Sequence, residues 1–186
     1  QIPYFLTANH CIGTAASASS INFYWFFEAA ACDSLAVPNF VVTSGGGSLL
    51  YTNYDVDVTL VRMNSNPPQG AFLAGWDASP VFPGEDIFSL HHPNGDLKKY
   101  SAGTLAGFGH YCMFVRSDPD FPLDRSKDIC TELEGSYLKV NWTQGTTEAG
   151  SSGSGIYTID SAGSYKLRGV LHGGDASCGK PDAPDY

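Results

Sequence analysis

Apolar and polar residues alternate along several short stretches of this chain. An alternation with a period of two is typical of a strand that buries one face. It is clearest where Val56, Val58 and Leu60 are separated by polar residues. This spacing predicts a strand over residues 54–63, in which Asp57 lies on the face opposite the three apolar side chains.

The same criterion predicts strands along most of the chain and no helix. No segment combines a sustained apolar period of 3.6 residues with capping residues. In one expected strand, Leu138, Val140 and Trp142 share a face. Besides 54–63, the expected strands, this one included, span residues 4–7, 20–27, 39–43, 49–52, 71–75, 86–91, 98–108, 136–142, 155–159 and 165–172.

Turn residues separate these strands and indicate an all-β fold. The chain of 186 residues contains 21 glycines and 11 prolines, which interrupt regular structure at short intervals. Many short strands at this spacing predict a barrel or a sandwich with antiparallel pairing, and the length allows two small lobes. The stretch 77–85 is the expected linker between lobes. Expected turns are Gly45-Gly46-Gly47, Pro67-Pro68, Asn94-Gly95 and Ala162-Gly163-Ser164.

The net charge of the chain restricts the classes of partner that it can bind. The formal net charge is -9 at pH 7, which argues against binding to nucleic acid or to an anionic membrane. No apolar run approaches the length needed to cross a bilayer. This balance suits a soluble, secreted protein with a mild attraction for cationic substrates.

Five cysteines without the spacing of a zinc site suggest disulfides and an oxidising compartment. Cys11 and Cys32 flank one loop, Cys112 and Cys130 flank another, and Cys178 is left over. A bridge that closes a loop of about 20 residues stabilises a protein by roughly 3 kcal/mol in the chain-entropy model. The alternative is that some of these residues are buried free thiols.

The chain begins at Gln1, without a methionine or a signal peptide, and it ends at Tyr186 without a closing element. We expect it to be an excised piece of a longer, processed precursor. The upstream part of that precursor is where we expect the partner of Cys178.

Three separate segments supply the side chains of a Ser-His-Asp triad. His10 follows the first expected strand, Asp57 lies in the strand 54–63, and Ser152 lies in a run rich in glycine and serine. A serine hydroxyl needs a base to act as a nucleophile, and the base needs a carboxylate that fixes its tautomer. The order His, Asp, Ser is that of one of three known triad architectures. The combination therefore predicts serine-nucleophile chemistry.

The glycines around Ser152 meet a second requirement of that chemistry. They let the backbone turn sharply, so that the amides of Gly150 and Ser152 aim at one point. Such a pair forms an oxyanion hole, in which one donor contributes about 3 to 4 kcal/mol. Taken singly, the motifs have ordinary readings as a structural histidine, a salt-bridge aspartate and a loop. Their combination in this order favours the triad.

The run Tyr4-Phe5-Leu6-Thr7-Ala8-Asn9-His10-Cys11 resembles the histidine motif of chymotrypsin-like serine proteases, and most closely that of secreted bacterial lysyl endopeptidases. The resemblance runs from residue 4 to the C-terminus and is weakest over 109–134. Other segments that resemble this branch are Ala74-Gly75-Trp76-Asp77, Leu90-His91-His92-Pro93, Thr147-Glu148 and Leu171-His172-Gly173-Gly174.

The resemblance implies a particular fold and a site within it. The fold would be two antiparallel Greek-key β-barrels of the chymotrypsin type, with the active site in the cleft between them. The N-terminal lobe would span 1–78 and the C-terminal lobe 79–186. We expect both to be incomplete, because the chain begins after the first strands and ends before the last.

The resemblance also assigns roles to single residues. His10 would be the general base, Asp57 its orienting carboxylate and Ser152 the nucleophile. Gly150 and Ser152 would supply the oxyanion-hole amides.

Substrate binding and disulfide pairing follow from the same resemblance. The strand through Leu171, His172 and Gly173 would pair with an extended peptide. Cys11 and Cys32 would form the bridge behind the histidine loop. In the lysyl branch the cysteine that matches Cys178 pairs with one near the mature N-terminus.

The lysyl branch binds the lysine of its substrate with an aspartate that follows the cysteine and precedes a Tyr-Gly. The candidates here are Asp182 and Asp185, and we select Asp185, which precedes Tyr186 although the register differs by one. His172 would line the same pocket. A buried carboxylate pairs with lysine or arginine, so its charge does not choose between them. The alternatives are a solvated terminal loop and a structural histidine.

The serine segment departs from the common motif Gly-Asp-Ser-Gly-Gly-Pro. Ser151 stands in place of its aspartate, Ser154 in place of its second glycine and Gly155 in place of its proline. Because Ser151 carries no charge, it cannot pair with a new N-terminal ammonium, and that activation switch is not encoded here. The lysyl branch also has serines at the first two of these places.

We therefore expect a secreted serine endopeptidase that cleaves after lysine or arginine through an acyl-enzyme. It would act as a monomer on protein or peptide substrates, without nucleic acid, membrane, cofactor or metal. The alternative is a protease fold retained as a binding or adhesion module without turnover. Two sets of residues lack the spacing of a metal site, namely His91 with His92, and Asp118, Asp120, Asp124 and Asp128.

Overall fold

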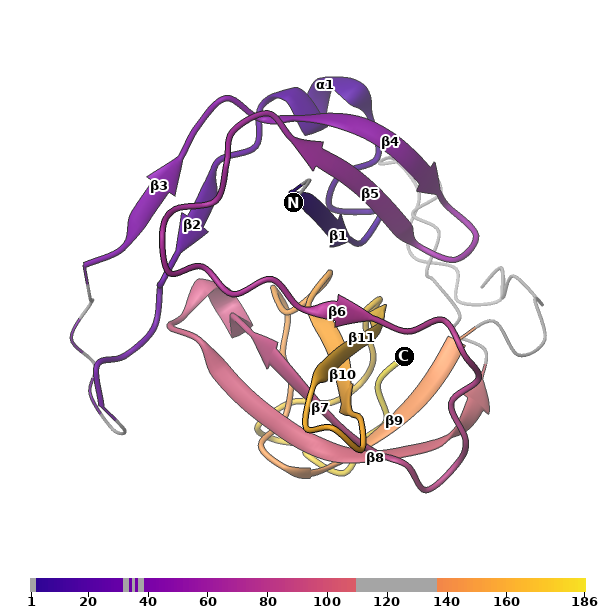
Figure 1. The fold of residues 1–186 in the computed structure, drawn as a ribbon. Helices are drawn as coiled ribbons and strands as arrows, with labels where there is room; N and C mark the ends of the chain where they lie inside the picture. The colour runs from indigo at the N-terminus through magenta and orange to yellow at the C-terminus, as the bar shows by residue number, and fades with distance from the viewer. Residues whose placement is uncertain (1–2, 32–33, 35, 37–38, 110–136) are drawn as a thin grey trace, which may run out of the picture.

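The computed structural model describes residues 3–31, 34, 36, 39–109 and 137–186. The described residues are mostly strands with almost no helix (Figure 1), so the all-β prediction is confirmed. In chain order the elements are β1 Tyr4–Thr7, α1 Ala15–Ser19, β2 Phe23–Trp25, β3 Val41–Thr43, β4 Gly47–Asn53, β5 Val58–Met63, β6 Gly75–Trp76, β7 Asp86–His91, the 3-10 turn η1 Pro93–Gly95, β8 Lys99–Gly109, β9 Tyr137–Gln144, β10 Gly155–Ile159 and β11 Tyr165–Val170.

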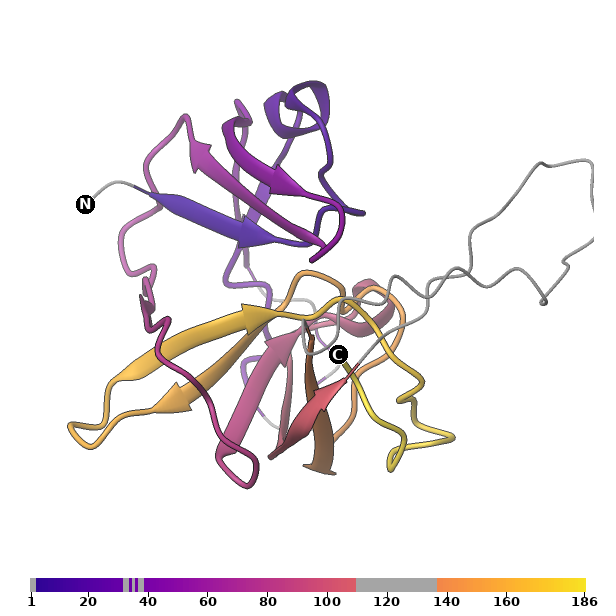
Figure 2. The ribbon, with the colours of Figure 1, turned by 90° about the vertical axis from the view of Figure 1, so that its right-hand side faces the viewer.

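The strands form two main groups, which remain separate in a view turned by 90° (Figure 2). The upper group is a three-stranded antiparallel sheet in the order β1-β5-β4, with a separate antiparallel pair of β2 and β3. The lower group is a six-stranded sheet in the order β6-β11-β10-β7-β8-β9. These sheets are open in the part of the chain that the structure describes.

The helix α1 was not expected from the sequence. It is only five residues long, too short to show an apolar period. A capping box starts it, because the Ser17 N–H donates to the Thr14 hydroxyl and the Thr14 N–H donates to the Ser17 hydroxyl, each at 3.1 Å. The pair of Thr14 and Ser17 was the available local signal.

Strand β5 buries the face opposite the one that apolar alternation suggests. Thr59 and Val61 are fully buried, whereas Val56 is 38% exposed. Burial of the Thr59 hydroxyl is possible because it donates to the Ile12 carbonyl at 2.8 Å. Asp57 therefore belongs to the interior side, as part of a turn that precedes β5 rather than within the strand.

The core of the lower sheet contains the face predicted for β9. Val140 and Trp142 are buried in one cluster with residues from β7, β10 and the C-terminal segment, and Leu138 packs against that cluster. The expected face of this strand is therefore confirmed.

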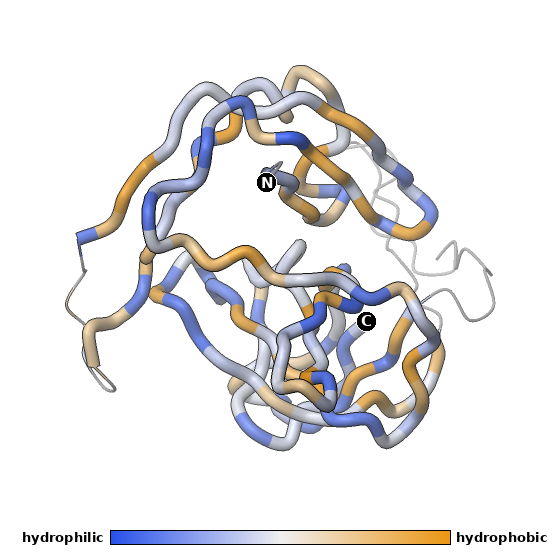
Figure 3. Tube along the Cα trace, viewed as in Figure 1, coloured by the Kyte–Doolittle hydropathy of each residue, from blue (hydrophilic) through white to orange (hydrophobic). Residues whose placement is uncertain are grey.

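The crossing between the two sheets lies earlier than the expected linker at 77–85. β6 pairs in parallel with β11, so the chain has joined the lower sheet by residue 75. β6 nevertheless lies within the range 1–78 that was expected to form the N-terminal lobe. The hydrophobic stretch 71–74 that leads into β6 is orange in Figure 3. The parallel pairing is an exception to the expected antiparallel pattern.

The cysteine pairing stays a prediction. Cys11 and Cys178 are exposed free thiols in the structure. Cys32, Cys112 and Cys130 lie outside the described residues, as do Asp118, Asp120, Asp124 and Asp128. In the described part of the chain, no helix is both long and apolar enough for a membrane span.

A close backbone approach makes Gly103 a test of this fold. A Cβ on Gly103 would lie 2.9 Å from the Trp142 Cα and still closer to the Asn141 carbonyl oxygen in the neighbouring strand β9. We expect Gly103→Ala to lower the free energy of unfolding by about 1–3 kcal/mol, because β8 and β9 must separate locally. Urea unfolding followed by fluorescence measures this change.

The matched control is Gly169→Ala in β11. There the nearest atoms to a Cβ are those of Ile156 at an ordinary 3.8 Å, so we expect unchanged or slightly increased stability. Equal stability of the two variants would contradict the pairing of β8 with β9.

Candidate active site

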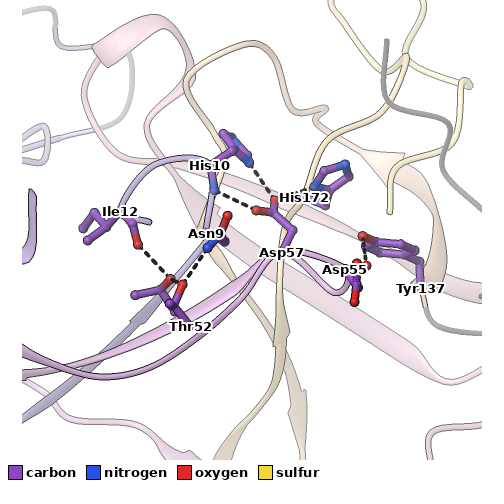
Figure 4. Close-up of polar contacts among 9 residues, drawn as sticks. Asn9, His10, Ile12, Thr52, Asp55, Asp57, Tyr137 and His172 are labelled. Atoms are coloured by element: carbon purple, nitrogen blue, oxygen red, sulfur yellow. Dashed lines mark hydrogen bonds and ion pairs between the residues drawn. The ribbon is translucent and has the colours of Figure 1, made fainter. Parts of the chain in front are cut away.

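Three segments that are distant in the sequence meet at the carboxylate of Asp57 (Figure 4). The His10 ring Nδ1 lies 2.6 Å from Asp57 Oδ2, and the His10 backbone N–H donates to Asp57 Oδ1 at 2.8 Å. The ring Nδ1 of His172 also bonds to Asp57 Oδ2. Asp57 is 2% exposed and His172 is 5% exposed. The structure thus brings together His10 and Asp57 from the predicted triad, and adds His172.

The turn between β4 and β5 presents the Asp57 side chain. Asp57 has a positive φ of 47°, a left-handed conformation that is uncommon for residues other than glycine. Its N–H donates to the Tyr54 carbonyl at 3.2 Å, which closes the turn. The Asn53 side chain accepts from the Asp55 N–H at 2.8 Å in the same turn. Local hydrogen bonds therefore hold the carboxylate toward His10.

A turn after β1 presents His10. The N–H groups of Cys11 and Ile12 both donate to the Ala8 carbonyl, at 3.3 and 3.2 Å. The Asn9 side chain donates to the Thr52 hydroxyl at 2.6 Å. The histidine turn is thus attached to β4, next to the turn that carries the carboxylate.

His172 has a role that the sequence did not reveal. It was expected to line the specificity pocket, but its ring bonds to Asp57 and packs edge-on to the His10 ring, with centroids 5.7 Å apart. The ring of Tyr137 packs against it at 5.2 Å, and the Tyr137 hydroxyl donates to the Asp55 carbonyl at 2.9 Å. No local pattern in the sequence signals this contact.

The hydrogen bonds at Asp57 shift the ionisation of both partners. Burial disfavours the charged carboxylate, but the hydrogen bonds from His10 and His172 outweigh it, and the pKa of Asp57 lies well below its usual value. The hydrogen bond to Asp57, with a further one involving Cys11, raises the pKa of His10 above its ordinary 6.5. The arrangement therefore favours a carboxylate beside an imidazole of increased basicity.

The segment 148–154, called here the serine loop, packs against the strand that leads to His10. A Cβ on Gly153 would lie 3.0 Å from the Ala8 nitrogen, so the loop approaches β1 as closely as a glycine permits. Ser152 and Gly150 line a groove of about 1310 Å³ together with residues of β1. Among the described residues no hydrogen bond of the Ser152 hydroxyl is found, whereas the neighbouring Ser151 hydroxyl bonds to His91 and to the Glu148 N–H.

The amides predicted to form the oxyanion hole are free of partners among the described residues. The N–H groups on either side of Ser152 have fixed acceptors, since Ser151 donates to the Glu148 carbonyl and Gly153 to the Leu171 carbonyl. No such bond involves the N–H of Gly150 or Ser152. Gly150 has a φ of +90°, a conformation that favours glycine.

All three residues of the predicted substrate strand already use backbone groups within the protein, and the His172 N–H donates to the Tyr186 carbonyl at 2.8 Å. The N–H and C=O of Leu171 each bond to the serine loop at 2.8 Å, and those of Gly173 bond to Tyr186 at 3.3 and 2.8 Å. Gly174 faces Asp185 across an antiparallel bridge. No backbone hydrogen bond of Gly174 occurs among the described residues, so its N–H and C=O point to the outer edge.

The two candidate aspartates of the specificity pocket differ in burial. Asp185 is 1% exposed, whereas Asp182 is exposed. The indole of Trp142 donates to Asp185 Oδ2 at 2.6 Å, and the Thr147 hydroxyl donates to the same oxygen. Burial raises the pKa of Asp185, and the hydrogen bonds from Thr147, Trp142 and the Ala176 backbone only partly oppose this shift. No ion pair in the described part of the chain includes Asp185.

The same three residues at the carboxylate are donor types found at metal sites. One ring nitrogen of His10, a carboxylate oxygen of Asp57 and one ring nitrogen of His172 lie within 4.8 Å of one another. Two ligands of a tetrahedral zinc with bonds of about 2.0 Å stand roughly 3.3 Å apart. The 2.6 Å between His10 and Asp57 is instead a hydrogen-bond distance, so we assign the cluster to proton chemistry.

Comparison with known proteins identifies the family. The family model described as lysyl endopeptidase, C-terminal domain, matches residues 1–186. The lysyl endopeptidase of Pseudomonas aeruginosa is 36% identical over 180 residues, which cover 95% of this chain and 35% of that protein. The chain therefore spans about a third of the length of that relative.

Solved structures share the fold at low identity. The protease domain of MamO from Magnetospirillum magneticum superposes with a TM-score of 0.54 and 12% identity, over 98% of this chain and 77% of that one. The HtrA-type protease AlgW, solved with a decapeptide, gives a TM-score of 0.51 and 15% identity, over 98% and 44%. Because the family model matches from the first residue to the last, the resemblance to lysyl endopeptidases seen in the sequence is confirmed: this chain belongs to the lysyl endopeptidase C-terminal domain family.

Proposed function

We propose that this chain is the catalytic domain of a secreted serine endopeptidase, with His10 as general base, Asp57 as its orienting carboxylate and Ser152 as nucleophile. The main support is the contact of 2.6 Å between His10 Nδ1 and Asp57, together with the close packing of Gly153 in the serine loop on Ala8, two residues before His10. Because Nδ1 faces the carboxylate, the other ring nitrogen is left to accept the serine proton.

The proposed reaction passes through an acyl-enzyme. Ser152 Oγ attacks the peptide carbonyl while His10 takes its proton, and the carbonyl oxygen becomes an oxyanion that accepts from the Gly150 and Ser152 amides. His10 then gives the proton to the leaving amine. Water attacks the acyl group in the same way and releases the carboxylate product. The partner-free amides support this assignment.

The substrate backbone would bind along Gly174. Its N–H and C=O are open at the strand edge, whereas those of Leu171 and Gly173 serve the protein itself. An extended peptide beside Gly174 would form a short antiparallel pair with it. This assignment moves the expected edge contact one residue beyond Gly173 and keeps His172 at the carboxylate.

The preference for a basic residue before the cleaved bond would come from Asp185. A buried carboxylate without a cation is costly, and the raised pKa of Asp185 reflects that cost. The ammonium of a substrate lysine would offset it. Both side-chain donors, Trp142 and Thr147, act on the single oxygen Oδ2. The Ala176 N–H also donates to this carboxylate. Its charge alone does not choose between lysine and arginine, and we propose lysine because the matched relative is described as a lysyl endopeptidase.

The first prediction concerns the nucleophile. A fluorophosphonate should label the protein at Ser152, and Ser152→Ala should abolish both labelling and peptide hydrolysis. Ser154→Ala is the matched control, because this serine lies in the same loop and should leave labelling unchanged. Mass spectrometry of the labelled peptide locates the modification. Labelling at another residue, or a labelled Ser152→Ala variant, would contradict the assignment.

The second prediction concerns the base. In a Ser152→Ala background, the His10 ring should titrate above pH 6.5, and adding Asp57→Asn should bring its midpoint down toward about 6.5. Because the neutral ring is the base, kcat/KM of the active protein should be lost as the pH falls through this raised pKa. NMR of the imidazole measures the midpoint.

Asp55→Asn is the control for this titration, because Asp55 lies in the same turn and is exposed. It should leave the midpoint of His10 in place. Equal midpoints with and without the Asp57 carboxylate would rule out its coupling to the ring.

The third prediction concerns specificity. Asp185→Asn should lower kcat/KM for peptides cleaved after lysine by about two to three orders of magnitude, since a buried ion pair loses its anion. Wild-type protein should favour lysine over arginine in matched fluorogenic peptides. Asp182→Asn should behave as wild type because Asp182 is exposed. An Asp185→Asn variant that cleaves lysine peptides normally would place the specificity elsewhere.

A further inference from the structure

A fully buried chain of hydrogen bonds lies beneath the serine loop. The ring Nδ1 of His91 bonds to the Ser151 hydroxyl at 2.9 Å, and its Nε2 bonds to the Ser101 hydroxyl at 3.0 Å. All three side chains are at most 1% exposed. They come from the end of β7, the start of β8 and the serine loop. These hydrogen bonds therefore connect the serine loop, which carries the proposed nucleophile, to the lower sheet.

The donors and acceptors of this hydrogen-bond network fit a neutral His91 ring. A neutral ring has one donor and one acceptor nitrogen, and each hydroxyl beside it can act in either sense. The Ser151 oxygen also accepts from the Glu148 N–H at 3.3 Å. Burial, with a smaller contribution from His92, lowers the pKa of His91. Each nitrogen and oxygen of this network thus has a hydrogen-bond partner without a charge on the ring.

The segment that carries His91 holds the serine loop at a second point. The Asn94 N–H donates to the Ala149 carbonyl at 2.7 Å. Because the C=O and N–H of a trans peptide point in opposite directions, this bond turns the Gly150 N–H away from Asn94. The segment 91–94 thus bonds to the residues on both sides of Gly150. Asn94 bonds to Ala149 through the backbone, and the His91 ring bonds to Ser151.

We propose that His91 is a positioning residue for the oxyanion site, holding the serine loop through Ser151 so that the amides of Gly150 and Ser152 stay aimed at one point. The inference rests on the proposed function. Ser151 stands where the common motif has an aspartate. A neutral hydroxyl held by a buried imidazole here anchors the loop without an ion pair. Its effect on catalysis is through the loop, since His91 is buried away from the groove.

Two variants separate this role from a merely structural one. His91→Asn keeps an amide group where Nδ1 faces Ser151, but the shorter side chain leaves a larger cavity than glutamine would. His91→Gln reaches the place of Nε2, which faces Ser101, and fills the site better. If His91 only stabilised the fold, His91→Asn would be the more impaired variant. Ser101→Ala is the matched control, because it removes the hydroxyl that bonds to Nε2 and leaves the bond between His91 and Ser151.

We expect the catalytic and the stability rankings to be opposite. With a peptide amide as substrate, kcat should fall about tenfold or more in His91→Gln, part of the 10²–10³ that one oxyanion donor contributes. In His91→Asn and Ser101→Ala it should stay within about threefold of wild type. KM should change little. The rate of labelling by a fluorophosphonate should follow kcat, since its phosphonyl oxygen occupies the same site. Urea unfolding should find His91→Asn less stable than His91→Gln.

The outcomes also separate this proposal from the proposed function. Wild-type protein that neither cleaves peptides nor is labelled would overturn both. An active wild type whose His91→Gln variant keeps kcat and the labelling rate within twofold would overturn the positioning role alone. The positioning role would also be overturned if kcat were lower in His91→Asn than in His91→Gln, in the same order as their stabilities in urea.

Discussion

The buried carboxylate of Asp57 is the constraint on which the rest of the site depends. A carboxylate that is 2% exposed is stable only if its oxygens are hydrogen-bonded. Here three donors meet it, namely the N–H and ring of His10 and the ring of His172. These bonds also offset the strain of its positive φ, about 1–3 kcal/mol for a residue other than glycine.

This one side chain joins the two groups of strands. Asp57 and His10 belong to turns of the upper sheet, whereas His172 follows β11 of the lower sheet. The serine loop is held in the same way, because Gly153 packs closely on β1 and its N–H donates to the Leu171 carbonyl. The geometry of the site is thus a property of both sheets together, since either sheet alone supplies only part of it.

Buried polar groups near the site are stabilised in three different ways. Asp57 is held as an anion by donors that favour its charge. Asp185 is buried with donors from Trp142, Thr147 and the Ala176 backbone, and no ion pair in the described part of the chain includes it. His91 is held neutral between hydroxyls. Donors thus stabilise the charge of Asp57, burial disfavours a charge on Asp185, and His91 stays uncharged beneath the serine loop.

Much of this protein follows from its sequence alone. The strand pattern depends on local alternation and turn residues, so nearly every expected strand is present, and the motif around His10 is sufficient to indicate the family. Other features needed the tertiary structure. Apolar alternation selected Val56 and its neighbours as the buried face, but a partner for the Thr59 hydroxyl decides in favour of the opposite face. The contacts of His172 with Asp57 and of His91 with Ser151 join residues 115 and 60 positions apart. The sequence by itself determined the elements and the chemistry available, because both are local, whereas only the folded chain decided which polar groups are buried together, because hydrogen-bond partners come from distant segments.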